Sequence, residues 1–135
     1  MTLKQYYEAV NGDLFGYNAV MQRLGKEERI IRLLNILKND TNADELTAAI
    51  AQEDAVTAYR AIHSLKGVGL NLGLTRLCNA SVALLEAFRE NGPEAEFFRP
   101  ETLASEALTP DIRQKASLLS QTFYHITDLI SEIDL

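Results

Sequence analysis

The side chain in this sequence best suited to chemistry is His63. The other histidine, His125, lies far away in the chain, and neither has a metal-ligand partner three or four residues along. The single cysteine, Cys78, falls on an apolar stripe and is expected to be a small buried hydrophobic residue. There is no glycine-rich phosphate loop and no nucleophile elbow. Neither a metal site nor a common enzyme motif is therefore predicted.

The surroundings of His63 favour a nucleophilic role. On a helix, His63 is rotated by about 100° from Ile62, which belongs to the apolar stripe. Its own face carries four further residues at helical spacing, Tyr59, Lys66, Gly67 and Leu70. The polar members indicate a face in water, where an imidazole is partly neutral at pH 7 and can act as a nucleophile. Lys66, one turn along, could neutralise a charged group attached to His63.

Two glycines near His63 are unusual for a helix, because each costs about 1 kcal/mol relative to alanine. Gly69 lies on the apolar stripe, where close helix packing would explain it. Gly67 lies beside His63 and opens room for a bulky group to approach the ring. A phosphoryl group suits this setting, because phosphoryl transfer depends mainly on positioning and charge neutralisation. On spacing alone, the alternative is an ordinary surface histidine beside a lysine.

The elements that must position these residues are helices, because apolar residues recur at spacings of three and four throughout the chain. Turn and capping residues mark the ends. Asp13 is predicted to cap a second short helix, Thr41 with Asp44 to form a weak capping box, and Asp54 to cap the histidine helix. Gly73 is predicted to follow the end of that helix, and Thr109 with Pro110 to begin the last one.

The predicted fold is all-α: an antiparallel four-helix bundle with short accessory N-terminal helices. We expect a single domain over residues 1–135. Its predicted parts are the accessory helices at 1–24, a core at 26–91 with the histidine helix at about 54–72, a connection at 93–110 with a helical turn near 101–107, and a C-terminal helix at 111–134.

The C-terminal helix has the most regular apolar stripe of the chain, at Ile112, Ala116, Leu119, Phe123, Ile126, Ile130 and Ile133. This stripe either packs in the bundle or forms the interface of a dimer. His125 lies off it and is expected to be a partly exposed structural residue. The tyrosines Tyr6, Tyr7 and Tyr17 are expected to pack the end of the bundle.

The composition argues against several classes of protein. The formal net charge of −6 disfavours nucleic-acid binding and adsorption to an anionic membrane. One cysteine rules out an internal disulfide and a multi-cysteine zinc site. No apolar run is long enough for a transmembrane helix, and no secretory signal is recognisable. The cytoplasm is the expected compartment.

A longer motif surrounds the histidine. The string His63-Ser64-Leu65-Lys66-Gly67, followed by Asn71-Leu72-Gly73, Leu77 and Leu84, resembles the histidine-containing phosphotransfer (HPt) domain. The flanking pairs Arg23-Leu24, Ala49-Ile50 and Glu53-Asp54 are also similar to that family. The resemblance covers roughly residues 20–91.

The resemblance implies a four-helix bundle that takes a phosphoryl group from a receiver-domain aspartate and passes it to another. By position, His63 would be the phosphoacceptor, Lys66 its charge partner and Gly67 the cleared site, with Tyr59 and Leu70 also in contact with phosphate or receiver. The domain would have no kinase activity and no cofactor of its own, because the receiver supplies Mg²⁺. The implied partners are the receiver domains of a response regulator and of a hybrid histidine kinase, with the chain itself a monomer.

Two positions depart from the family pattern. Members often place Glu or Gln directly after the leucine of the neighbouring helix, where it can orient the imidazole, whereas here Leu84 is followed by Leu85 and only then by Glu86. Leu70 is larger than the residue common there, and either enlarges a docking surface or packs on the first helix.

Three other functions stay open at this point. The chain could be a bundle that docks a receiver without carrying phosphate. It could be a small enzyme or metal bundle, although Glu-x-x-His pairs are lacking. It could also be an interaction protein that dimerises through the stripe at 112–133.

Overall fold

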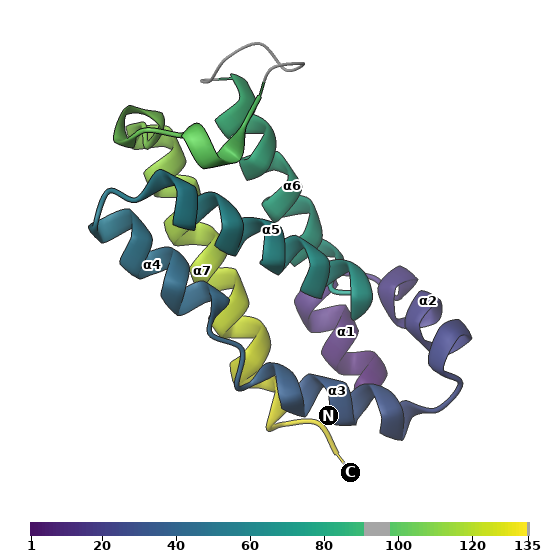
Figure 1. The fold of residues 1–135 in the computed structure, drawn as a ribbon. Helices are drawn as coiled ribbons and strands as arrows, with labels where there is room; N and C mark the ends of the chain where they lie inside the picture. Colours follow the sequence, from purple (N-terminus) through teal and green to yellow (C-terminus); the bar gives the residue numbers. More distant parts are fainter. Residues whose placement is uncertain (91–97, 135) are drawn as a thin grey trace.

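The computed structural model describes residues 1–90 and 98–134, and the regular structure there is entirely helical, which confirms the all-α fold class (Figure 1). The α-helices are α1 (Leu3–Asn11), α2 (Phe15–Leu24), α3 (Glu27–Leu37), α4 (Asn42–Ala51), α5 (Ala55–Asn71), α6 (Thr75–Glu90) and α7 (Pro110–Ile130). None of these helices is both long and apolar enough to cross a lipid bilayer.

Local signals placed the ends of the two longest helices correctly. The Asp54 side chain accepts a hydrogen bond from the backbone N–H of Thr57 at the start of α5. Thr109 caps α7 in the same way, with Pro110 in its first turn. Gly73 follows α5 with a φ of 65°, in the left-handed region that favours glycine.

Two other predicted caps are confirmed only in part. Leu14 is the N-cap of α2, and Asp13, one residue earlier, accepts from the N–H of Phe15 at 3.1 Å. Thr41 is the N-cap residue of α4, but its hydroxyl donates to the Glu45 carboxylate at 3.2 Å and forms no capping bond with the helix backbone. Asp13 thus still satisfies the first N–H of α2, whereas the capping bond predicted from Thr41 is not formed.

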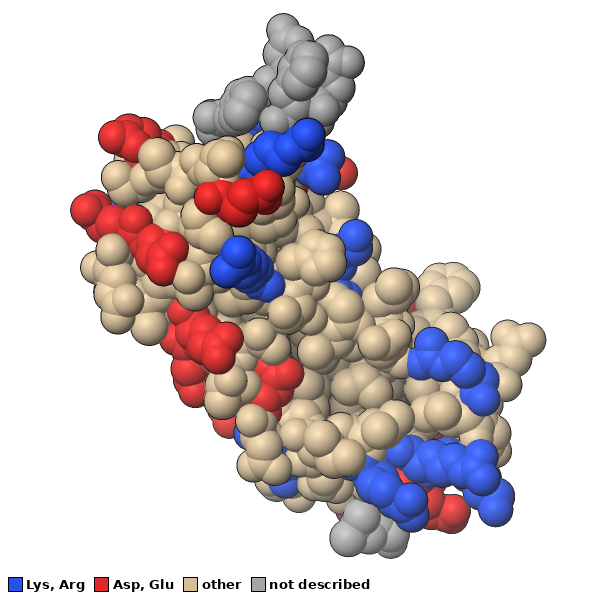
Figure 2. Space-filling view, viewed as in Figure 1, with Lys and Arg blue, Asp and Glu red and all other residues tan. Residues whose placement is uncertain are grey.

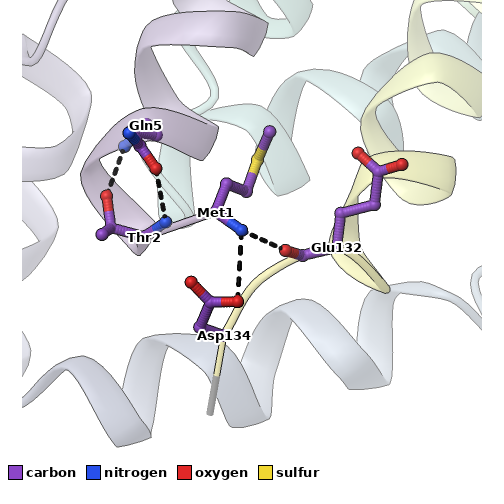
Figure 3. A network of polar contacts seen from close by, with 5 residues as sticks. All are labelled: Met1, Thr2, Gln5, Glu132 and Asp134. Carbon is purple, nitrogen blue, oxygen red and sulfur yellow. Dashed lines mark hydrogen bonds and ion pairs between the residues drawn. The ribbon is translucent and has the colours of Figure 1, made fainter.

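The C-terminal helix ends at Ile130, earlier than the predicted residue 134. The chain then turns and meets the N-terminus (Figure 3). The N–H of Asp134 donates to the Met1 carbonyl at 2.7 Å, and the Met1 ammonium donates to the Glu132 carbonyl at 2.6 Å. These long-range bonds replace the hydrogen bonds that a continued helix would form.

The connection before α7 contains the short 3-10 helices η2 (Pro100–Thr102) and η3 (Ser105–Ala107) in place of the single predicted turn. The part of the predicted connection at 93–97 lies outside the described residues. Phe98 and Leu108 are buried, so this segment closes one end of the core.

The core is enclosed by a ring of helices in which α5 contacts α4 and α6, and α7 contacts the same two helices. The stripe residues from Ile112 to Ile130 on α7, and Ile133 beyond its end, are all at most 7% exposed. Since these side chains are inside the chain's own core, they are not available for a dimer interface, and the alternative of a protein that dimerises through that stripe is contradicted.

The N-terminal helices pack on the end of this ring, as expected from their tyrosines. Tyr6 donates its hydroxyl to the Ile126 carbonyl at 3.0 Å, and Tyr7 donates to the Leu72 carbonyl at 2.6 Å. A Cβ on Gly16 would lie 1.9 Å from the carbonyl oxygen of Gly73. The start of α2 therefore lies directly on the turn between α5 and α6.

Candidate functional site

His63 lies midway along α5 with an exposed side chain, next to the fully buried Ile62. Among the described residues, its imidazole has no hydrogen-bond or ion-pair partner. It borders two hollows, one on either side. The ring is therefore open to a group that arrives from solvent.

The first hollow lies between α5 and α6 and has a volume of about 250 Å³. Its lining from α5 is Tyr59, His63 and Lys66, and its lining from α6 is Val82, Leu85, Glu86 and Arg89. The structure thus brings the predicted nucleophile and its predicted charge partner to one concave surface.

The second hollow has a volume of about 520 Å³ and reaches from α5 to η2. It is lined by Tyr59, Arg60, His63, Ser64, Pro100 and Glu101. The segment before α7 therefore contributes to the surroundings of the imidazole, which the motif around His63 did not indicate.

Tyr59 was expected on the solvent-facing side of the histidine helix. The structure contradicts this, because Tyr59 is buried, with only 6% of it exposed. Its ring packs edge-on against Phe88, with centroids 5.6 Å apart, and at a tilt against Phe98, with centroids 5.5 Å apart. Tyr59 lies toward α6 on α5, where these aromatic rings cover it. It forms the floor of both hollows beside His63.

The two glycines of α5 have opposite surroundings. A Cβ on Gly69 would lie 2.7 Å from the backbone nitrogen of Cys78, so Gly69 permits the close contact of α5 with α6. A Cβ on Gly67 would meet nothing within 4 Å. Close helix packing therefore explains the glycine at position 69 but not the one at position 67. At Gly67 the absence of a side chain leaves the helix surface open one turn from His63.

Leu70 continues the His63 face toward the end of α5 and is 64% exposed. Of the two alternatives for this residue, packing on the first helix is therefore wrong. Lys66 lies between His63 and Leu70 on α5 and is half-buried at the edge of the first hollow.

Leu85 is 7% exposed and presents an alkyl side chain to the hollow at His63. Glu86 lines the same hollow, and so does Arg89, one turn further along α6. The guanidinium carbon of Arg89 lies 5.1 Å from the centroid of the Phe98 ring. Arg89 was missed from the sequence, although its spacing of four from Leu85 places the two on one face of α6.

The charges around His63 are mixed. Lys66, Arg60 and Arg89 supply three cations, and Glu86 and Glu101 supply two carboxylates. At the start of the same helix, hydrogen bonds from the Thr57 hydroxyl and N–H hold the pKa of Asp54 below its usual value. The negative charge of Asp54 also interacts favourably with the positive end of the helix dipole. The cap therefore stabilises the helix that carries His63.

His125 is exposed on α7, as expected, in a separate hollow that includes Arg76 and Leu118. None of these three residues lines either hollow at His63. Within the described part of the chain, no three His, Cys, Asp or Glu side chains are grouped so that they could hold a metal ion.

A family model described as Hpt domain matches residues 34–132. No curated protein and no solved structure matches the chain. The matched region contains α4 to α7 in full and the end of α3.

Proposed function

Because the chain belongs to the Hpt domain family, we propose that His63 carries a phosphoryl group in a multistep two-component relay. The observation that carries the proposal is the exposed imidazole of His63 in a hollow with Lys66, beside the open position at Gly67. In this proposal α4 to α7 form the antiparallel four-helix bundle of a cytoplasmic, monomeric carrier.

The transfer step needs no cofactor on this chain. A neutral imidazole nitrogen of His63 attacks the phosphorus of a receiver's aspartyl phosphate, the P–N bond forms, and the P–O bond breaks to release the aspartate carboxylate. Donation to a second receiver reverses these bond changes. Lys66 and Arg89 offset the charge of the bound phosphoryl group, while Mg²⁺ is expected on the receiver.

Kinase activity is not part of this function. The chain accepts a phosphoryl group that is already activated as an acyl phosphate, so its own residues need to position the imidazole and balance charge. The receiver domains of a hybrid histidine kinase and of a response regulator are the proposed donor and acceptor.

A second candidate is a bundle that binds a receiver without carrying phosphate. Leu85 favours it, because an alkyl side chain lies where a polar group would orient the imidazole, and His63 has no partner among the described residues. In that case receiver binding would not depend on the imidazole.

The test is phosphate transfer from a panel of purified phosphorylated receiver domains, with Mg²⁺, to wild type, His63→Gln and His125→Gln. We expect acid-labile, alkali-stable label on wild type and on His125→Gln and none on His63→Gln, because only His63 faces the two hollows. The His125→Gln variant controls for loss of a histidine as such. Receiver binding without label on any variant would instead support the docking bundle.

A further inference from the structure

The imidazole of His63 has two nitrogens, and phosphoryl transfer needs each of them in a different state. One nitrogen must present its lone pair to phosphorus, while the other holds the ring proton. The hydrogen bond that the protonated nitrogen donates decides which of the two tautomers is present. No group in the described part of the chain accepts such a bond from His63, so the acceptor has to be sought among the side chains around the ring.

Two carboxylates are within the hollows at His63. Leu85 has an alkyl side chain and so offers no acceptor. Glu86 lines the first hollow, and Glu101, from η2, lines the second. Both side chains are exposed, and neither carboxylate forms a hydrogen bond or an ion pair with another described residue. Either one is therefore free to accept from the imidazole.

The cations distinguish the two hollows. Lys66 and Arg89 both line the first, whereas Arg60 is the one cation among the residues that line the second. A phosphoryl anion is therefore better accommodated in the first hollow. The ring nitrogen on that side would be the nucleophile, and the other nitrogen would face the second hollow, where Glu101 lies.

The segment that carries Glu101 is held against α5. The helix η2 contacts α5, and Figure 1 shows this green segment beside the first half of that helix. The buried ring of Phe98 packs at a tilt on Tyr59, with centroids 5.5 Å apart, and the Thr102 hydroxyl donates to the Arg99 carbonyl at 2.7 Å. These contacts fix the backbone around Glu101 and leave its side chain able to turn toward the imidazole.

The surroundings of Glu101 are polar and open to water. Figure 2 shows red and blue atoms close together over η2 and the first half of α5, and mainly tan atoms over the second half of α5. Arg60 and Ser64 line the same hollow as Glu101. A carboxylate that turns toward the ring there stays largely hydrated, so the move has little desolvation cost.

We propose that Glu101 is a positioning residue for the transfer reaction. Its carboxylate accepts the imidazole N–H of His63 in the second hollow, so that the other ring nitrogen presents its lone pair in the first hollow. The inference rests on the proposed carrier function.

The proton balance of the transfer step follows from this placement. When the P–N bond forms and the P–O bond to the receiver's aspartate breaks, the ring proton stays on the nitrogen beside Glu101. The carboxylate then pairs with the positive charge of the phosphorylated ring. Donation to a second receiver breaks the P–N bond and returns the electron pair to the ring, with the proton still in place.

The test compares four variants with wild type. Glu101→Ala removes the acceptor, whereas Glu101→Gln keeps an acceptor oxygen in its amide. Glu106→Ala removes the same charge from η3, in the same segment, and Glu106 is exposed and lines neither hollow. Glu86→Ala removes the rival carboxylate. Thermal unfolding followed by circular dichroism verifies that each variant is folded.

The first readout is the rate at which phosphoramidate labels His63. Phosphoramidate is a small donor that releases ammonia and needs no receiver surface, so its rate reports on the imidazole itself. We expect Glu101→Ala to be labelled about tenfold more slowly, because the ring loses its productive orientation. Glu101→Gln should stay closer to wild type than to Glu101→Ala, and Glu106→Ala and Glu86→Ala should match wild type.

The second readout is the tautomer of the neutral His63 ring, from the nitrogen chemical shifts of protein with 15N-labelled histidine. One tautomer should dominate in wild type and in Glu101→Gln. Glu101→Ala should shift toward the mixture of tautomers found in free histidine. A role of Glu101 that is only structural would leave these shifts unchanged.

Wild-type labelling of Glu101→Ala by phosphoramidate would overturn the inference and leave the carrier function intact. So would a loss of labelling in Glu86→Ala alone, or a slow Glu101→Ala that Glu101→Gln does not rescue. Slower transfer only from receivers would make Glu101 a receiver contact and also overturn it. If neither phosphoramidate nor any receiver labels wild type, the carrier function fails, and the inference fails with it.

Discussion

At the scale of single residues, the site depends on the side chain that Gly67 lacks as well as on the imidazole of His63. Gly67 sits one turn from His63 with open space at its Cβ position. Helix propensity alone would favour alanine there by about 1 kcal/mol. The glycine thus costs stability and leaves the approach to the imidazole clear, which is the combination expected at a transfer site.

Gly67→Ala should separate these two effects. The free energy of unfolding, measured by urea denaturation, should rise by up to about 1 kcal/mol because alanine is the better helix former. Transfer from a phosphorylated receiver to His63 should slow, because the new methyl group stands where the partner approaches. A more stable protein that transfers at the wild-type rate would contradict this role for Gly67.

At the scale of elements, the pairing of α5 with α6 fixes the hollow at His63. The two helices approach closely at Gly69, where a Cβ would lie 2.7 Å from the backbone nitrogen of Cys78 and 3.0 Å from its Cα. Backbone atoms cannot move aside as a flexible side chain can. Lys66 and Arg89 therefore face one hollow only while this contact holds the helices together.

Gly69→Ala should lower the free energy of unfolding by about 2 kcal/mol, the usual cost of forcing an extra carbon into a packed contact. Urea denaturation monitored by circular dichroism measures it, with Gly67→Ala as the matched control on the same helix. Opposite signs for the two variants are expected. If Gly69→Ala were as stable as Gly67→Ala, the helices would not be in close contact there.

At the scale of the whole molecule, the N-terminal helices are attached to the bundle through tyrosine hydroxyls. Burial raises the pKa of Tyr6 and Tyr7 well above the ordinary value of 10.0. Burial and a hydrogen bond to Glu27 raise the pKa of Tyr17 to about 12. All three must stay protonated for α1 and α2 to remain packed.

The protein should therefore lose stability in alkali. An unfolded tyrosine releases its proton near pH 10, whereas the folded groups hold theirs to higher pH. Their contribution is therefore complete below pH 10 and is lost as the pH rises, through about 12 for Tyr17 and at still higher pH for Tyr6 and Tyr7. Tyr7→Phe removes one such group and should reduce the slope of unfolding free energy against pH by up to about 1.4 kcal/mol per pH unit.

Urea denaturation between pH 9 and pH 12, with tyrosine ionisation followed by absorbance, checks this. Wild type at pH 8 gives the reference stability, because Tyr6, Tyr7 and Tyr17 are all protonated there. Ionisation of Tyr6, Tyr7 and Tyr17 near pH 10 while the helices remain folded would show that the N-terminal helices are not packed as described.

Much of this protein follows from its sequence because the signals are local. Helix periodicity predicted the all-α class, and Asp54 and Thr109 predicted the starts of α5 and α7. Helical spacing also predicted a solvent face on α5, on which His63 and Leu70 are exposed but Tyr59 is buried. Each depends on contacts within one or two helical turns, so the residues involved are also neighbours in the chain. The phosphoacceptor role itself stays a prediction until transfer is measured.

The tertiary structure decided what depends on residues far apart in the chain. It buried Tyr59 under Phe98, ended α7 early by joining Asp134 to Met1, and set Gly16 against Gly73. It also placed residues of α3 and α5, two helices separated by all of α4, around one apolar groove. The sequence pattern shows which face of a helix is apolar. Which other helix covers that face, and which apolar side chains stay exposed, depends on how all the helices pack together.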